Sequence, residues 1–335
     1  MAKTFLTMAD LAARRGVDKE IGLVQQVVNY SPEITTIMGR TVPGTYVEAK
    51  VQISIPKGGA FRPIGSGAFT SAGTYERRRF NAYPWDSQLG IDELEMVAAN
   101  QIGDSLGDLQ ADEVAGALMD KAIKFSQQFY AGTNIDANGF PGLQAILQIY
   151  NGTAAGNAGV IDSRTGKVMV NYIDAGGAGP ATECVWYVWA HPQGVHFLYG
   201  GDKVLDINPW VWQYMPDNVT PGKRLRMSVS NISGWIGLAC AQPWGIGVIK
   251  NINAASPWTD ALSQKLHALW PTGIKFTHCF ATKRARALLQ ASRPVTLFGQ
   301  GGVRPDQPII APAPVVDIEG VPIIPTDGIQ LQAKW

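Results

Sequence analysis

One long apolar stripe dominates the hydrophobic pattern of the chain. Residues 109–131 contain no proline, and their apolar positions recur at steps of four, four, three and four: Val114, Leu118, Ala122, Phe125 and Phe129. This spacing predicts an α-helix over 109–131, about 35 Å long at 1.5 Å per residue. Asp108 is a candidate N-cap and Gly132 a candidate C-cap. Asp120 and Lys124 add an ion pair in the favoured orientation.

A second pattern, with a period of two, predicts a long strand over Thr45–Pro56. Aliphatic residues alternate there with polar ones: Val47, Ala49, Val51, Ile53 and Ile55. A glycine-punctuated segment follows, and Thr74–Trp85 can return as the partner strand. Two strands alone are marginally stable in water, so we expect this extended hairpin to need a partner surface.

Shorter elements are predicted on both sides of these two. Short helices are expected from Thr7 and Asp18, over Ile91–Gln101, from a Ser256-Pro257 start to Pro271, and over Ala281–Ala291. The apolar face of the 91–101 helix would comprise Ile91, Leu94, Val97 and Ala98. Strands are expected at Glu183–Ala190, Val195–Tyr199, Leu225–Val229, Trp235–Cys240 and Ile274–Cys279. Of these, Glu183–Ala190 is apolar on both faces, which predicts a central, buried strand.

The charge content of the chain argues against some classes of function. The chain has 335 residues with a net charge of +1, from 28 basic and 27 acidic residues. The near-zero balance argues against a dedicated nucleic-acid-binding protein. Only 16% of residues are charged, below the roughly 25% of typical soluble proteins. This suits a surface covered by neighbouring subunits, although a well-buried monomer would have the same composition.

The residue patterns of common enzyme and metal sites are missing. The four histidines and three cysteines lack zinc spacing. Cys184 and His191 would face opposite sides of a strand, as would His278 and Cys279. No phosphate-binding loop or nucleophile elbow is present. We therefore expect no enzymatic activity: no catalytic residue, no cofactor and no metal.

The positions of the tryptophans, the cysteines and the apolar runs give three further indications. Eight of the ten tryptophans lie between Trp186 and Trp270, which we interpret as an aromatic core in preference to a sugar platform. Three widely spaced cysteines make no disulfide framework and favour a reducing compartment. The longest apolar run, Trp235–Ile249, is too short to cross a bilayer as a helix, and no membrane partner is expected.

The order of motifs after the long helix is more specific than any one of them. The helix leads through Tyr130 and Gly132 into an Asn/Asp-rich turn and then Phe140-Pro141-Gly142-Leu143. This order resembles the major capsid proteins of tailed bacteriophages, which implies an α+β HK97-type fold. The resemblance implies an N-terminal arm (1–42), an extended hairpin or E-loop (43–85), a peripheral domain (86–140 and 251–298) with its spine helix at 109–131, an axial domain (141–250) and a C-terminal segment (299–335) that pairs back onto the body.

The resemblance also implies a function and partners. The protein would self-assemble into pentamers and hexamers that form an icosahedral head around double-stranded DNA, without sequence-specific binding. A portal protein and a separate scaffolding or decoration protein would be further partners, with assembly in the bacterial cytoplasm and a final place in the virion. The alternatives are an encapsulin-like compartment of the same fold, or a β-rich carbohydrate-binding or hydrolytic protein.

The hairpin is also the most basic part of the chain. Its candidates for contact between subunits are Lys57, Arg62, Arg77, Arg78 and Arg79. Arginine can meet a carboxylate on a neighbour with two hydrogen bonds. The alternative interpretation is a solvated, charged face. Contact with DNA is less favoured, because successive strand residues point to opposite faces. A lysine–asparagine crosslink at Lys57 is conceivable, but nothing in the sequence supports it.

Overall fold

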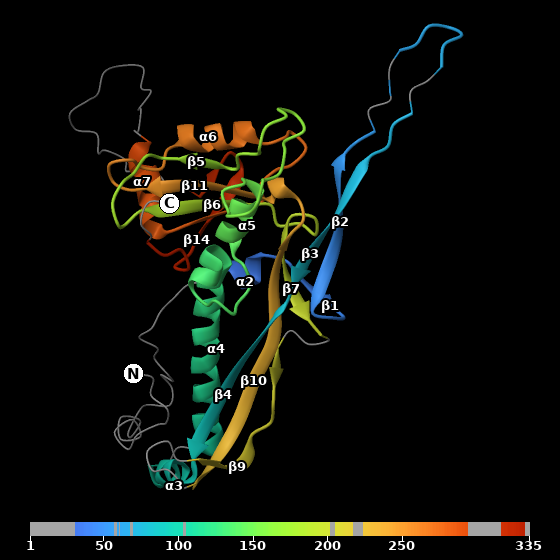
Figure 1. Ribbon diagram of the computed structural model, residues 1–335. Coiled ribbons are helices and arrows are strands. Elements are labelled where there is room, and N and C mark those ends of the chain that lie inside the picture. Colours follow the sequence, from blue (N-terminus) through green and yellow to red (C-terminus); the bar gives the residue numbers. More distant parts are fainter. Residues whose placement is uncertain are drawn as a thin grey trace, which may run out of the picture.

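The computed structural model describes residues 31–56, 59, 61–67, 70–102, 105–201, 205–216, 224–293 and 316–331. The helices expected from Thr7 and Asp18, and the hairpin residue Lys57, lie outside these residues. Figure 1 shows three parts: an elongated lower body around α4, a compact upper body around a second sheet, and a hairpin that projects from their junction.

The long predicted helix is α4 (Leu106–Ala131), the spine of the lower body. It begins three residues earlier than expected, because Ser105, and not Asp108, is the N-cap that accepts a hydrogen bond from the Asp108 backbone N–H. Gly132 caps its C-terminus, and Asp120 pairs with Lys124 at 2.9 Å, as predicted. Within the apolar stripe only Phe129 is fully buried; the middle of the helix is half-exposed.

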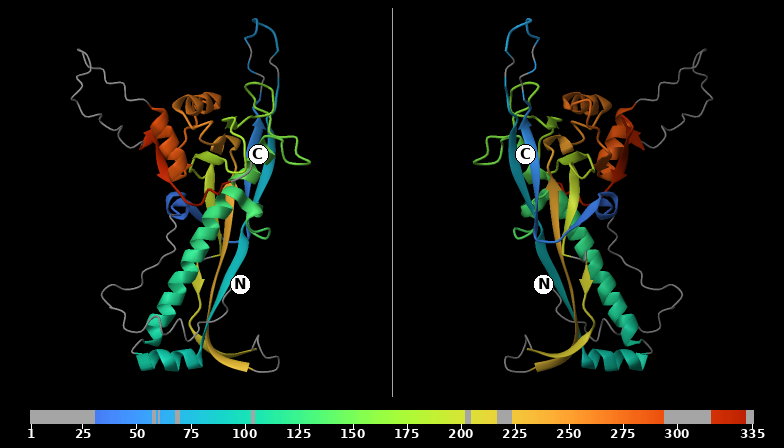
Figure 2. Two further views of the ribbon diagram at one scale, coloured as in Figure 1. Left: turned by 90° about the vertical axis from the view of Figure 1, so that its left-hand side faces the viewer. Right: turned by 90° about the vertical axis from the view of Figure 1, so that its right-hand side faces the viewer.

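The sheet of the lower body runs alongside α4 (Figure 2). Its strand order is β1 (Gly39–Val42), β7 (Val195–Gly200), β10 (Arg224–Cys240) and β4 (Tyr83–Asp92), with β8 (Asp206–Ile207) and β9 (Val211–Pro216) also paired to β10. The separate strands expected at 225–229 and 235–240 are thus one strand of 17 residues. Trp85 of β4 packs edge-on against Phe125 of α4 at 5.1 Å, so this face of the sheet is covered by the helix.

The helix expected from Ile91 begins later and buries a different face. It is α3 (Glu93–Ile102), while Ile91 is a buried residue of β4. Ala99 packs in a small core with Ile91, whereas Leu94 and Val97 are 73% and 50% exposed. The predicted apolar face was therefore wrong. Apolar spacing marks a face of a helix, but burial requires a surface opposite it, and α3 lies at the narrow end of the molecule.

The upper body is built on a second six-stranded sheet. Its order is β13 (Asp317–Ile318), β14 (Val321–Pro325), β12 (His278–Ala281), β6 (Glu183–Val188), β11 (Ile246–Ile252) and β5 (Tyr172–Asp174). All six residues of β6 are buried, as predicted for a central strand. Alternate residues of β6 enter two cores: Trp186 packs in the one that includes α5 (Leu143–Tyr150), and Tyr187 in the one that includes α6 (Asp260–Leu269) and α7 (Lys283–Ser292).

The helices of the upper body differ at their starts from the sequence prediction. α6 is capped by Thr259, whose side chain accepts from the Leu262 N–H, so the Ser256-Pro257 start was wrong. α7 is capped by Thr282 in the same way. The strand expected at 274–279 is β12, which begins at His278.

The two sheets draw their strands from several of the expected ranges. β10, in the range expected for the axial domain, pairs with β4 of the lower body over ten residue pairs. β12, in the range expected for the peripheral domain, pairs with β6 and β14 in the upper sheet. Long-range pairing decides which sheet a strand joins, and the expected division of the chain into peripheral and axial ranges stays a prediction.

The tryptophan-rich region only partly forms a core. Trp186, Trp258 and Trp270 are buried, as the aromatic-core interpretation requires. Trp212 and Trp235 are exposed on β9 and β10. For these two residues the interpretation was wrong, because each lies on a strand face that the neighbouring elements leave open.

A buried carboxylate joins three distant segments of the chain. Glu33 at the start of α2 (Glu33–Thr36) is fully buried. Its Oε1 accepts hydrogen bonds from the Tyr130 hydroxyl at 2.7 Å and from the Thr326 hydroxyl. Tyr130 ends the spine helix and Thr326 follows β14, so this junction holds the entry to β1, the end of α4 and the C-terminal strands together.

Stability should fall under alkaline conditions. Burial raises the pKa of Tyr130, Tyr150 and Tyr187 above the usual 10.0 and that of the Cys240 thiol from 9.0 to about 12. The unfolded chain loses these protons at lower pH than the folded chain. Their stabilising contribution is thus complete below about pH 9 and is lost as pH rises further. Calorimetry over a pH series should show a falling Tm above this value, with a shallower fall in Cys240→Ala; a flat profile would contradict the argument.

Candidate functional site

The hairpin is the part of the chain that its own fold leaves unburied. β2 (Tyr46–Ser54) and β3 (Thr74–Asn81) pair with each other as a separate two-stranded sheet. The expected return strand, Thr74–Trp85, is divided at Ala82 between β3 and β4, so one arm of the hairpin continues directly into the lower body. Both views in Figure 2 show the hairpin extending past the upper body.

The far end of the hairpin carries apolar side chains with no burial. Phe61 and Ile64 are fully exposed, and Ile53 and Ile55 are more than half exposed. Arg62 lies between the first two, and its guanidinium donates to the Ser66 carbonyl at 2.5 Å. Exposed apolar residues on a protrusion are typical of a surface that is covered by another molecule.

One face of the hairpin is a ladder of cations and aromatic rings. The β2–β3 register places Lys50 opposite Arg77, and Glu48 opposite Arg79. Arg79 lies over the Tyr46 ring at 3.8 Å, and Lys50 lies over Tyr75. The Arg77 side chain is 84% exposed and is 3.9 Å from Glu48. The directly opposed Lys50 and Arg77 repel each other, so this face is better satisfied beside negative charge.

The opposite face of the hairpin is fixed to the body through Arg78. This side chain is only 12% exposed. It donates to the Ala241 carbonyl at 2.9 Å and lies over the Tyr150 ring of α5 at 5.2 Å. A hollow of about 470 Å³ separates the rest of the hairpin base from α5. Of the candidate contact residues, Arg78 is therefore held against the body of its own chain, whereas Arg62, Arg77 and Arg79 contact residues of the hairpin and are exposed.

Removal of the Arg78 guanidinium should loosen the base of the hairpin. Arg78→Met keeps much of the apolar stem but leaves the Ala241 carbonyl without this donor, at an expected loss of about 1–3 kcal/mol. Hydrogen exchange of the β2 and β3 amides should become faster. The matched control is Arg77→Met, which changes an exposed arginine and should alter stability by less than about 0.5 kcal/mol. Equal effects of the two variants would contradict an anchoring role.

A second hollow, which the sequence patterns did not predict, lies on the face of the lower sheet that α4 does not cover. It has a volume of about 620 Å³, and Asp86, Asp206, Ser233 and Trp235 are among its lining residues. The alternation of exposed Pro84, Asp86 and Gln88 in the sequence marks this face, but assigning it requires the pairing of β4 with β10.

The metal-ligating side chains are dispersed among the described residues. Among the residues that the structure describes, no three His, Cys, Asp or Glu side chains are grouped so that they could hold a metal ion. All three cysteines are buried, and burial lowers the pKa of His196, His267 and His278. None of the described helices combines the length and hydrophobicity needed to cross a membrane.

Solved structures of bacteriophage chains are similar to this chain along nearly its whole length, and two of them serve as examples. A chain of bacteriophage Epsilon15 aligns over 100% of this chain and 98% of its own length, with a TM-score of 0.58 and 14% identity. The bacteriophage JBD30 capsid aligns over 96% of this chain and 99% of its own, with a TM-score of 0.51 and 11% identity. The sequence matches no protein-family profile and no curated protein. At these identities the similarity establishes the fold.

Proposed function

We propose that this chain, which has the HK97-type fold of tailed-phage capsid proteins, is a major capsid protein that assembles into the head shell. Its activity would be self-association into hexamers and pentamers, closed into an icosahedral shell around double-stranded DNA. The observation that carries this proposal is the projecting hairpin, whose apolar end and cationic face are largely exposed in the single chain.

Weak contacts between subunits can add up to a stable shell. An extended hairpin is only marginally stable by itself. When it lies on the surface of a neighbouring subunit, it can bury both its apolar and its charged groups. Each subunit of a closed shell makes several such contacts, and linked contacts give high avidity even when each is weak. The full-length fold similarity to a phage capsid supports the same conclusion.

The further partners belong to the proposal as well. A portal protein, a separate scaffolding or decoration protein and the enclosed DNA would meet the assembled shell. Assembly would take place in the host cytoplasm, and the protein would end in the virion. The net charge of +1 suits non-specific enclosure of DNA more than tight binding to it.

The two alternative functions have less support. An encapsulin-like compartment would share the fold, and would be distinguished by a protein cargo in place of DNA. A carbohydrate-binding or hydrolytic protein would need acid and base carboxylates close to exposed aromatic rings. Trp212 has Arg226 over its ring, 4.9 Å from the ring centroid, an arrangement that leaves less of the ring open to a sugar. Trp235 does lie beside Asp86 and Asp206 in the hollow of about 620 Å³, but the full-length fold similarity is to phage chains, which favours the capsid proposal.

The test is the state of association of the purified chain. Size-exclusion chromatography with light scattering, followed by negative-stain microscopy of the early fractions, should reveal capsomers, shells or hexagonal sheets. A 36.1 kDa monomer that persists at high concentration, under crowding and with candidate scaffolding protein would refute the proposal. The nucleic-acid content of purified shells would then separate a DNA-filled head from a cargo compartment.

A further inference from the structure

The helices α6 and α7 belong to the most one-sidedly charged stretch of the upper body. Residues 261–293 contain six lysine and arginine residues and no aspartate or glutamate. Both helices pack on the same face of the upper sheet, because Leu266 of α6 and Leu289 of α7 are buried in one core. Figure 1 places α7 on the side of the upper body that is away from the hairpin. The positive charge of these helices is therefore separate from that of the hairpin.

Two of the six cations are held by carboxylates of their own chain. Arg293 connects the end of α7 to the start of α6 through hydrogen bonds of 2.7 and 2.5 Å to Asp260. Arg284 lies 3.6 Å from Glu183, a buried carboxylate of β6. The other four are exposed or half-exposed and form no ion pair within the part of the chain that the structure describes: Lys265, Lys275, Lys283 and Arg286. Together these four residues define the basic surface.

Two residues of the basic surface occupy an unfavourable position in α7. Lys283 and Arg286 lie within the first four residues of this helix, and its first turn contains no acidic residue. The N-terminus of a helix carries a partial positive charge, so cations are repelled there and anions are favoured. The fold itself gives these two cations no compensating partner, and an external anion would offset the repulsion.

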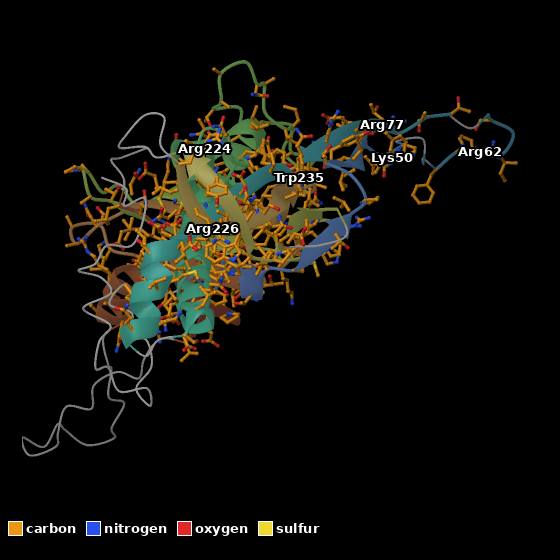
Figure 3. The ribbon with its side chains drawn as sticks, turned by 90° about the horizontal axis from the view of Figure 1, so that it is seen from below. Lys50, Arg62, Arg77, Arg224, Arg226 and Trp235 are labelled. Atoms are coloured by element: carbon orange, nitrogen blue, oxygen red, sulfur yellow. The ribbon has the colours of Figure 1, made fainter. Side chains whose placement is uncertain are left out.

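The make-up of the basic surface favours a polyanion over a protein partner. Protein interfaces usually combine polar groups with an apolar centre. On the hairpin, exposed cations such as Arg62 (Figure 3) stand beside exposed apolar side chains such as Phe61. Among the described residues of α6 and α7, by contrast, no large apolar side chain is exposed. Lysine and arginine without such a centre are suited to phosphate groups, which they bind through charge and hydrogen bonds.

We propose that the basic surface of α6 and α7, with Lys283 and Arg286 as its main contacts, binds the phosphate groups of the double-stranded DNA inside the shell. This inference rests on the proposed function and names the surface of the subunit that meets the enclosed DNA. A duplex carries one negative charge per about 1.7 Å of its axis, so a few cations find phosphates in any sequence. Each contact is weak, in agreement with the net charge of +1, but the many copies in a shell add up.

A double charge reversal tests the basic surface through two measurements with opposite signs. In the full chain, Lys283→Glu combined with Arg286→Glu should weaken the binding of a short DNA duplex of mixed sequence by about tenfold or more at low salt, as measured by fluorescence anisotropy. The slope of log K against log salt should fall by about two, one for each lost phosphate contact. The Tm of the same variant should rise by about 1 °C or more, because carboxylates replace cations at the start of α7. Weaker binding in a more stable protein is not explained by misfolding.

The matched control is Lys167→Glu combined with Arg224→Glu. It reverses one lysine and one arginine at exposed positions outside the basic surface and should leave DNA binding within about twofold. A loss confined to the first variant supports the proposal. Unchanged binding, an equal loss in the control, or a loss of self-association in place of DNA binding overturns it.

Light scattering on the same samples separates this inference from the proposed function. A wild type that assembles but does not bind the duplex at low salt overturns the DNA-binding surface alone. A wild type that binds the duplex through Lys283 and Arg286 but never assembles refutes the proposed function and leaves the surface standing.

Discussion

Replacing residues 55–73 by Asn-Gly should give a protein that folds normally and forms no closed shells. Ser54 and Thr74 are paired in the register, so a two-residue turn can join β2 to β3 directly. The removed segment includes the exposed Ile55, Phe61 and Ile64. Because these side chains are exposed in the single chain, we expect Tm to change by only a few degrees, while electron microscopy shows the loss of shells.

A milder variant separates the apolar contacts from the length of the hairpin. Phe61→Ser combined with Ile64→Ser keeps the full reach and both strands. If apolar burial at the tip drives closure, this variant should assemble at least tenfold less readily, which corresponds to about 1.4 kcal/mol. Normal shells from both variants would show that the hairpin end takes no part in assembly.

Phe129→Ala should be among the most destabilising single changes in the chain. Phe129 is fully buried near the end of α4, where its ring lies 5.5 Å from Phe197 of β7 and 6.1 Å from Phe280 of β12. It therefore connects the spine helix to both sheets. Truncation of a buried phenylalanine costs about 3–5 kcal/mol through lost burial and the cavity that remains, and urea unfolding would measure the loss.

Leu118→Ala is the matched control for this prediction. Leu118 belongs to the same apolar stripe of α4 but is only partly buried. Its truncation should cost about 1 kcal/mol. Equal losses in the free energy of unfolding would contradict this prediction. They would show that the buried C-terminal end of α4 contributes no more to stability than the partly buried middle of the helix.

Local patterns predicted the elements whose burial follows directly from the sequence. Three patterns each predicted the type of element that is observed: the helical period of α4, the alternation of β2 and the continuous apolar run of β6. The ends of helices were less certain, because Ser105 and Asp108 are both good caps and only three residues apart. The observed cap is itself local: the Ser105 hydroxyl accepts from the Asp108 N–H and donates to the Asp108 carboxylate, so the spacing of Ser105 and Asp108 was a signal that the sequence contained.

The sequence predicted which segment carries the candidate site, but not how the side chains of that site are arranged. The hairpin and its arginines could be located from sequence, yet their division between two faces required the β2–β3 register. β10 was divided into two strands, because Ser230–Gly234 interrupts its apolar pattern while its backbone pairing continues. Asp86 and Asp206 are 120 positions apart in the sequence, and only the shared partner Ser233 brings them to one hollow.

The junction at Glu33 has a consequence for the timing of synthesis. Its carboxylate is bonded by Tyr130 and by Thr326, and β14 completes the sheet beside β12 only when residues 321–325 are available. The ribosome makes the hairpin early and these partners late. A nascent chain therefore carries the hairpin before the Glu33 junction and the upper sheet can be completed. We expect the full packing of the subunit to form only near the end of translation.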